Sequence, residues 1–150
     1  MQAKPEARDM GIRAAHAGDA AAIATLAGQL GYPATREEIA RRLGEMNGRE
    51  VQVVLVAEAQ GQVIGWAHVA VEGHVVTDVR AELRALVVAE EQRSGGAGRR
   101  LLEAAENWAR EQGCGEIGLR SNVLRERAHP FYLRHGYEHY KTQKTFRKKL

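Results

Sequence analysis

An apolar segment that runs into a glycine-rich turn, and from there into a helix, constrains this chain more than any other feature. Residues 85–88 read Ala-Leu-Val-Val, residues 94–98 read Ser-Gly-Gly-Ala-Gly, and apolar residues then recur at helical spacing as far as residue 112. Glycines permit positive φ and a close approach to a ligand. Because the first N–H groups and the dipole of a helix attract anions, this order predicts a phosphate-binding loop. Arg93, Arg99 and Arg100 add positive charge to it.

Spacing excludes two common phosphate loops. A P-loop would need Gly-Lys followed by Ser or Thr, which the segment lacks, and the dinucleotide fingerprint would need a small residue where Leu101 stands. The pattern that remains is Arg93-x-x-Gly96-x-Gly98. The alternative for the glycine pair 95–96 is an ordinary turn between a strand and a helix.

Length and composition exclude several classes of protein. A chain of 150 residues with 44% hydrophobic content predicts a single domain over residues 1–150. The lone cysteine, Cys114, rules out an intrachain disulfide, and no histidines have metal-ligand spacing, so we expect no metal site. With no apolar run of about 18 residues, we expect a cytoplasmic protein with no membrane partner. The net charge of +3 lies largely in a basic C-terminal run, and no zinc-finger spacing accompanies it, so no nucleic-acid partner is expected.

Hydrophobic spacing and turn residues divide the chain into alternating elements. Strands are expected at residues 11–13, 51–58, 63–71, 82–88, 116–120, 137–140 and 144–148. Helices are expected between Asp19 and Gly31, from a capping box at Thr35 and Glu38 to near Gly44 or Gly48, at 98–112 and at 125–135. This mixed order predicts an α+β (mixed α/β) fold with a central twisted mixed sheet of about seven strands and flanking helices.

Two motifs carry a resemblance to a known family. Arg93-x-x-Gly96-x-Gly98 after a Leu-Val-Val strand resembles the acyl-CoA pyrophosphate loop of the GNAT superfamily of N-acetyltransferases. Downstream, residues 122–137 resemble the family segment Asn-x(5)-Ala-x-x-Phe-Tyr-x-x-x-Gly-Tyr. Residues 31–43 are similar to the first helical region of small bacterial members of the aminoglycoside N-acetyltransferase type. Two motifs in the family's order are more specific than either alone, and they imply the GNAT fold.

The resemblance implies acetyl-CoA as the acyl donor and assigns the residues that bind it. The strand at 82–88 would splay from its neighbour and admit the pantetheine arm, with backbone groups of Val87 and Val88 pairing with its amides. The N–H of Val88 would polarise the thioester carbonyl. The implied cofactor-binding residues are Leu86, Val87, Val88, Arg93, Ser94, Gly95, Gly96, Ala97, Gly98, Arg99, Arg100 and Asn122. Gly95 and Ala97 depart from the family's usual basic and large apolar residues, but both keep their N–H groups.

Three further side chains have a functional and a structural interpretation each. The resemblance implies that Tyr132 protonates the leaving thiolate, and a core aromatic is the alternative. Asn122 would contact the pantetheine arm, or cap the segment that follows it. Glu82 would act as general base, often through water, or pair with Arg80 or Arg84 on the surface. If no bulge intervenes, Glu82 and Val88 face the same side of the strand. His129 could face the acceptor, or act as a solvated or capping histidine.

These observations predict an N-acetyltransferase that moves an acetyl group directly from acetyl-CoA to a primary amine of a small molecule. One alternative is an acyl-CoA-binding module without catalysis, and another is a transferase that acetylates proteins or peptides. The acceptor pocket would involve residues 27–48, the loop 74–80 and the C-terminal hairpin. Acidic residues that could contact a polycationic acceptor are Glu37, Glu38, Glu45, Glu50 and Asp78. The resemblance leaves a homodimer open.

Overall fold

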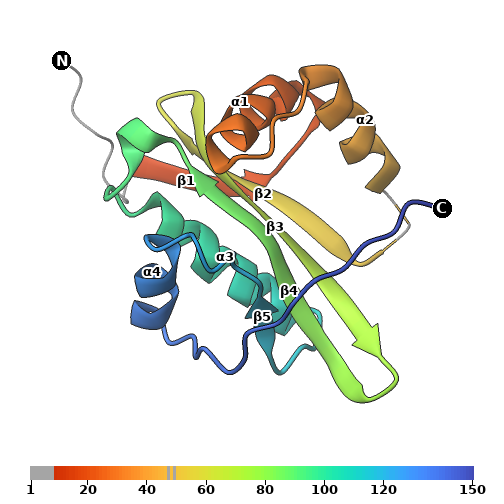
Figure 1. Ribbon diagram of the computed structural model, residues 1–150. Coiled ribbons are helices and arrows are strands. Elements are labelled where there is room, and N and C mark those ends of the chain that lie inside the picture. Colours follow the sequence, from red (N-terminus) through yellow and green to blue (C-terminus); the bar gives the residue numbers. More distant parts are fainter. Residues whose placement is uncertain (1–8, 47, 49) are drawn as a thin grey trace. The chain divides into compact units, whose positions relative to one another are not determined.

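The chain forms two compact units, one ending at Arg120 and one beginning at Ser121. Our computed structural model describes residues 9–46, 48 and 50–150 of them. The first unit holds a twisted sheet with helices on both faces, and the second holds one short helix and an irregular C-terminal segment (Figure 1).

The sheet of the first unit is mixed. Its strands are β1 (Met10–Ala14), β2 (Gln52–Ala59), β3 (Gln62–His74), β4 (Thr77–Val88) and β5 (Ile117–Leu119). Over the described residues they lie in the order β1-β2-β3-β4-β5. The first four are antiparallel neighbours, and β5 runs parallel to β4. The α+β class with a mixed sheet is therefore confirmed.

Three helices cover the two faces of this sheet. The helices α1 (Ala20–Leu30) and α2 (Arg36–Met46) lie on one face, hereafter the α1/α2 face, and α3 (Ala97–Glu111) lies on the other (Figure 1). The predicted capping box is confirmed, because Thr35 Oγ1 accepts from the N–H of Glu38 at 3.1 Å and Glu38 Oε2 accepts from the N–H of Thr35 at 3.0 Å. Gly31, with φ of 95°, ends α1 as expected.

Apolar side chains fill both sides of the sheet. On the α1/α2 face, Ile23 and Leu26 pack with Val56, Trp66 and Val87. On the opposite face, α3 turns its buried side chains inward, namely Ala97, Leu101, Leu102, Ala105 and Ala109. A side chain at Gly65 of β3 would stand 3.1 Å from Leu101 and 2.9 Å from the carbonyl oxygen of Val87, so only glycine lets α3 approach so closely.

A β-bulge divides β4 into two halves. His68 of β3 pairs with Ala85, but Val69 pairs with Leu83, so Arg84 is an extra residue on β4. The alternation of side chains therefore changes at this point. Glu82 pairs with Ala70 and shares the α1/α2 face, whereas Val88 lies beside Leu101 on the α3 face. The expectation that Glu82 and Val88 share a face is therefore wrong, because the bulge that it excluded is present.

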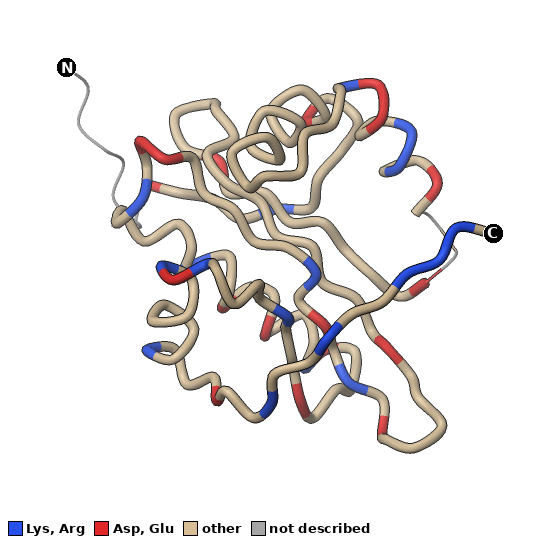
Figure 2. Tube along the Cα trace, viewed as in Figure 1, with Lys and Arg blue, Asp and Glu red and all other residues tan. Residues whose placement is uncertain are grey.

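The second unit contains α4 (Ala128–Arg134), which begins three residues later than expected and is followed by Gly136 with φ of 89°. The strands expected at 137–140 and 144–148 are absent from this described segment, so the described sheet has five strands and not about seven. An isolated hairpin needs an apolar face to pack. Here the large apolar side chains are not buried, since Tyr140 is 64% and Phe146 is 90% exposed. Basic residues dominate the rest of this segment (Figure 2).

Candidate functional site

The glycine loop joins β4 to α3, as expected, and two of its residues adopt left-handed backbone. Gly96, the N-cap of α3, has φ of 90°, and Ser94 has φ of 71°. Positive φ therefore falls on one glycine and on a serine, while Gly95 and Gly98 have ordinary values. The first intrahelical bond is donated by the N–H of Arg100 to the carbonyl oxygen of Gly96 at 3.0 Å. The N–H groups before it point out of the helix end, where an anion binds best.

The three arginines around this loop have different surroundings. Arg99 is two-thirds exposed and pairs with Glu103 at 2.8 Å, and Arg93 lies 3.9 Å from Glu90. Arg100 instead donates to the backbone carbonyl of Met10, at the start of β1, at 3.2 Å. The structure thus places Arg93 and Arg99 at the exposed side of the loop, while Arg100 ties α3 to the sheet.

The half of β4 that leads into the loop has an edge with no neighbouring strand among the described residues of this unit. The parallel ladder to β5 covers only Ala81, Glu82 and Leu83. Ala89 donates to Ile64 of β3 at 2.8 Å, and bonding alternates along an antiparallel pair. The amides of Leu86 and Val88 therefore point toward the open edge. Those of Val87 point toward β3, so the expectation that Val87 pairs with the pantetheine arm is corrected. The open edge is a ready partner for an extended ligand with amide groups.

Glu82 is a buried carboxyl group on the other half of β4. Its side chain is only 8% exposed, and Arg120 Nε lies 3.8 Å from its Oε1. Burial raises the pKa of Glu82, and the positive charge of Arg120 opposes that rise. The interpretation of Glu82 as a surface carboxylate is therefore wrong, and its arginine neighbour is Arg120 rather than Arg80 or Arg84. A raised pKa makes a carboxyl group a stronger base than an ordinary exposed carboxylate.

A network of polar side chains on the α1/α2 face, beside Glu82, was not predicted from the sequence. Arg84 donates to Glu50 at 2.9 Å, to Glu72 at 3.4 Å and to Gln52 Oε1 at 3.2 Å. The same Gln52 oxygen lies 2.9 Å from His68 Nε2. Polar residues at every second or fourth position of β3, such as His68 and Glu72, were the available signal. The bulge that brings Arg84 to His68 and Glu72 could not be recognised in the sequence.

Tyr132, in the second unit, stands in an aromatic cluster. Its ring meets those of Phe131 and Tyr137 edge-on, at centroid distances of 5.2 and 5.7 Å. Burial raises the pKa of Tyr132, which Arg125 partly offsets. The phenol is therefore protonated at neutral pH and able to donate.

Asn122 and His129 both make local hydrogen bonds in the second unit. Asn122 Oδ1 accepts from the N–H of Leu124 at 2.9 Å, and its carbonyl oxygen accepts from His129 Nε2 at 3.0 Å. Asn122 therefore bonds within the turn that follows it and is not the N-cap of α4, which is Arg127. The amide nitrogen of Asn122 is not used in either contact.

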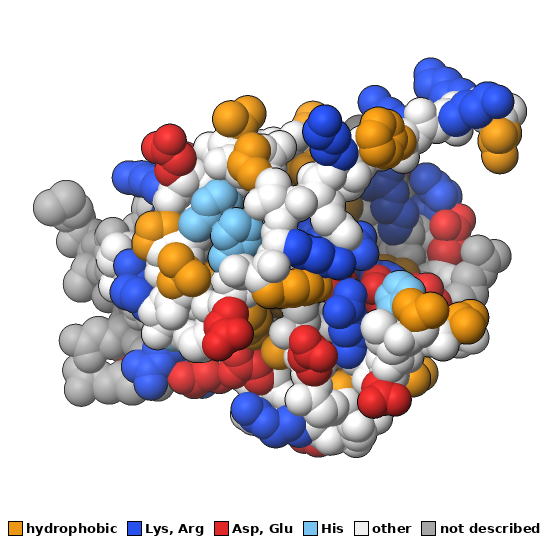
Figure 3. Space-filling model, turned by 60° about the horizontal axis from the view of Figure 1, so that its bottom comes forward, with side chains coloured by type: hydrophobic (Ala, Val, Ile, Leu, Met, Phe, Trp, Pro, Cys, Tyr) orange, Lys and Arg blue, Asp and Glu red, His pale blue; other side chains and the backbone are white. Residues whose placement is uncertain are grey.

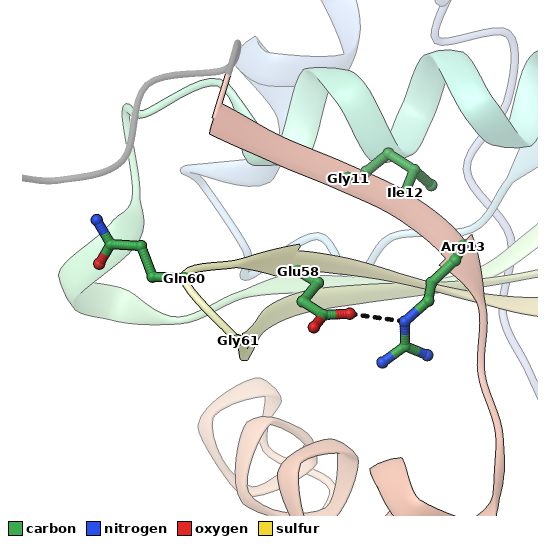
Figure 4. Close-up of a pocket in the computed structure, with 6 residues that line it drawn as sticks. All are labelled: Gly11, Ile12, Arg13, Glu58, Gln60 and Gly61. Carbon is green, nitrogen blue, oxygen red and sulfur yellow. Dashed lines mark hydrogen bonds and ion pairs between the residues drawn. The ribbon is translucent and has the colours of Figure 1, made fainter.

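A cavity of about 310 Å³ lies elsewhere, beside β1 and the β2–β3 turn (Figure 4). Its charged wall is Arg13, which donates to Glu58 at 2.7 Å and to both carboxylate oxygens of Asp19 at 2.8 and 2.9 Å. Because these partners occupy the guanidinium, the cavity offers no free charge to a ligand.

Acidic and basic side chains are interspersed on the face in Figure 3. Within the described ranges, no group of three potential ligands could hold a metal ion. No helix in these ranges is long and apolar enough to span a bilayer.

A strand with an open edge, leading through a glycine turn into an exposed helix N-terminus, defines a protein that binds an extended phosphate-bearing ligand. The sequence model of the acetyltransferase (GNAT) family matches residues 20–137. The chain belongs to this family and is an acyl-CoA-dependent N-acetyltransferase that uses acetyl-CoA.

Curated relatives are similar over most of their length. The uncharacterized N-acetyltransferase YhfO of Bacillus subtilis is 32% identical over 140 residues, covering 86% of this chain and 90% of the relative. An aminoglycoside N(6')-acetyltransferase type 1 of Stenotrophomonas maltophilia is 31% identical, covering 85% of each chain. An aminoalkylphosphonate N-acetyltransferase of Salmonella typhimurium is 32% identical, covering 75% of this chain and 71% of the relative.

Solved structures share the fold. The aminoglycoside N-acetyltransferase AAC(6')-Iy in complex with CoA superposes with a TM-score of 0.84 at 19% identity, covering 94% of this chain and 95% of the other. At this identity the similarity shows the fold alone.

Proposed function

We propose that this enzyme transfers an acetyl group from acetyl-CoA directly to a primary amine of a small molecule. The observation that carries the proposal is the open edge of β4 beside the glycine loop. Amide groups of Leu86 and Val88 face that edge, and the exposed start of α3 follows it within ten residues. A pantetheine arm carries amides and a pyrophosphate carries charge, so both halves of such a ligand meet complementary groups.

The binding residues follow from this placement. The N–H groups at Gly96 to Gly98 would hold the pyrophosphate, with Arg93 and Arg99 adding charge from the exposed side. Leu86 and Val88 would pair with the pantetheine amides, and Val88 N–H would polarise the thioester carbonyl. We retain Asn122 as a further pantetheine contact through its free amide nitrogen.

The chemistry needs a proton acceptor and a proton donor. Acetyl-CoA supplies an activated acetyl thioester. Glu82, directly or through a water molecule, takes one proton from the ammonium form of the acceptor, and the neutral amine nitrogen then forms a bond to the carbonyl carbon. The carbon–sulfur bond breaks, Tyr132 gives its phenolic proton to the thiolate, and the extra proton on the new amide nitrogen passes to the phenolate. The buried carboxyl of Glu82 and the protonated phenol of Tyr132 suit these roles.

We also infer that residues 1–150 act as one N-acetyltransferase domain. The family match runs without a break from residue 20 to residue 137 and so crosses the boundary at Arg120. The family motif that contains Tyr132 lies wholly beyond that boundary, so the first unit alone lacks the proposed acid.

Relatives that acetylate aminoglycosides and aminoalkylphosphonates support a small-molecule acceptor. Both are small molecules that bear an amine. An acceptor panel should therefore contain sisomicin, 2-aminoethylphosphonate, a simple alkylamine and a lysine-containing peptide.

Calorimetric titration with acetyl-CoA, beside dephospho-CoA and NAD, tests the proposed donor site. Acetyl-CoA should bind, dephospho-CoA more weakly, and NAD not at all. Arg99→Met should weaken acetyl-CoA, whereas Arg110→Met at the far end of α3 should not. Equal binding of NAD and acetyl-CoA would contradict the assignment of the loop.

Release of free thiol in the presence of each amine then tests the acceptor. Turnover on small amines in preference to the peptide supports the proposal. Preference for the peptide would instead indicate a protein acetyltransferase. Saturable acetyl-CoA binding without any thiol release would indicate a binding module.

A further inference from the structure

Hydrogen bonds on the α1/α2 face fix the protonation pattern of His68. An arginine can only donate, so the Gln52 atom that Arg84 Nη1 approaches at 3.2 Å is the oxygen. The neighbouring His68 Nε2, 2.9 Å from that oxygen, must therefore carry a hydrogen and donate it. In the neutral ring the hydrogen on Nε2 leaves Nδ1 with a lone pair.

His68 is also held in its neutral form. Burial is the main cause that lowers its pKa to about 4, with Arg84 adding to this effect and Glu50 opposing it. The charged groups of the network around it are Glu50 beyond the start of β2, Glu72 on β3 and Arg84 on β4. Arg84 is bonded to both carboxylates, which weakens their attraction for a proton on the imidazole.

The lone pair of His68 shares a sheet face with the proposed base. His68 is two residues from Ala70, which is the cross-strand partner of Glu82. Such diagonal positions bring Cβ atoms to within about 8 Å on one face. Nδ1 has no hydrogen-bond partner among the described residues, and the cross-strand partners of His68 and Glu82 are the small residues Ala85 and Ala70.

We propose that His68 Nδ1 accepts a hydrogen bond from the nitrogen of the acceptor amine and that Arg84, through Gln52, is the positioning residue that keeps this lone pair available. The inference rests on the proposed function. A primary amine keeps two N–H groups after it loses one proton from the ammonium form. His68 can thus hold the nitrogen throughout the attack, while Glu82 takes the proton that leaves.

The network makes a direct prediction for the ring itself. Nitrogen-15 spectra of histidine-labelled protein at pH 7 should show His68 as the Nε2–H tautomer with an unprotonated Nδ1. Arg84→Met frees Gln52 to rotate and should give a mixture of tautomers. Arg110→Met, an exposed arginine on α3, should leave the signals unchanged. A single Nδ1–H tautomer in the wild-type protein would overturn the proposal without any assay of activity.

Kinetics test the contact with the amine. His68→Phe should raise the KM for the alkylamine roughly ten- to a hundredfold, the loss expected for a hydrogen bond to a charged group, and leave the KM for acetyl-CoA within about twofold. His68→Asn, whose oxygen can stand near the position of Nδ1, should recover part of the loss. His139→Asn, on the exposed C-terminal segment, is the matched control.

The substitution Gln52→Glu gives the most direct kinetic test of the His68 lone pair. A carboxylate beside the ring favours the imidazolium, which has no lone pair, so the KM for the amine should rise as the pH falls and recover at higher pH. An unchanged amine KM in both Gln52→Glu and His68→Phe would overturn the inference. A wild-type enzyme that binds no acetyl-CoA or turns over no amine would instead contradict the proposed function, and the tautomer would still be read independently.

Discussion

Burial of Glu82 affects both the stability of the protein and the proposed proton transfer, and a single substitution can separate these two effects. A carboxyl group whose pKa is raised by burial is stabilised in the folded protein as the neutral acid. It therefore favours folding at low pH, and this contribution is lost as the pH rises through the raised pKa. Ionisation of the buried carboxyl group therefore costs stability, which is a common feature of sites built for proton transfer.

Glu82→Gln should separate these two effects. We expect the free energy of unfolding at pH 7.5 to stay equal or increase, because a neutral isostere replaces a buried charge. Turnover should fall by roughly a hundredfold or more, in the range of a lost general base. Urea unfolding and thiol release measure the two quantities, with the exposed Glu138→Gln as control. A large loss of stability with full turnover would refute the role of Glu82.

Tyr132→Phe removes one oxygen from the aromatic cluster of the second unit. We expect turnover to fall by roughly ten- to a thousandfold, with little change in the affinity for acetyl-CoA. The edge-on contacts with Phe131 and Tyr137 involve the ring and should survive. Steady-state kinetics with Tyr140→Phe as control measures the effect, and wild-type turnover in Tyr132→Phe would remove its role as acid.

At the scale of elements, the contact of α3 with the sheet depends on Gly65. An added methyl group would meet the carbonyl oxygen of Val87 at 2.9 Å, which is closer than such contacts allow. Gly65→Ala should therefore destabilise the protein by about 1–3 kcal/mol and weaken acetyl-CoA binding through the displaced strand. Gly28→Ala in α1, where the added atom meets nothing within 4 Å, should be neutral or stabilising. Thermal unfolding and calorimetry compare the two.

The stability of helix α2 depends on its capping box more than the stability of a buried helix would. None of its residues is fully buried, and it packs mainly against α1. Thr35→Ala removes the side-chain bond to Glu38 and should cost about 1 kcal/mol, felt mainly as local opening. Hydrogen exchange should speed up in α2 and not in α3. Thr25→Ala, which alters a hydroxyl within α1, should leave α2 protected.

Most elements could be predicted from the sequence because local signals agree with the fold. Capping at Thr35, the stop at Gly31 and the apolar stripe around Leu101 each depend on neighbours within one or two turns. The bulge at Arg84 could not be predicted, because it appears only when the register between β3 and β4 is known. The network of His68 and Gln52 depends on that same register, so its residues looked like ordinary strand positions.

The C-terminal segment shows the opposite case. Its alternation of polar and apolar residues predicts strands, but strand formation also needs a partner edge and a face to bury. Within the described residues 137–150 these interactions do not form, and Tyr140 and Phe146 remain exposed. The family motif predicts roles for Tyr132 and Asn122. Their contacts with neighbouring residues in the second unit are known only from the structure.

For the molecule as a whole, His68 should make stability depend on pH between about 4 and 6.5. Its pKa is lowered to about 4 in the folded protein and is near 6.5 when unfolded, so the unfolded state binds the proton first as the pH falls. Stability should therefore drop by roughly 3 kcal/mol over this window. Urea unfolding at several pH values should show a flatter slope in His68→Phe than in the wild type. Equal slopes would mean that His68 titrates normally.

The extra residue in β4 also determines what the loss of one codon would do to the strand. Deletion of Arg84 would leave Leu83 opposite Val69 and Ala85 opposite His68, so plain alternation would return without any change of face. Glu82 would stay on the α1/α2 face and Val88 on the α3 face. The residue that would be lost is the arginine that joins Glu50, Gln52 and Glu72. The bulge thus adds a charged group to the sheet while the proposed base and the edge proposed to hold acetyl-CoA keep their places.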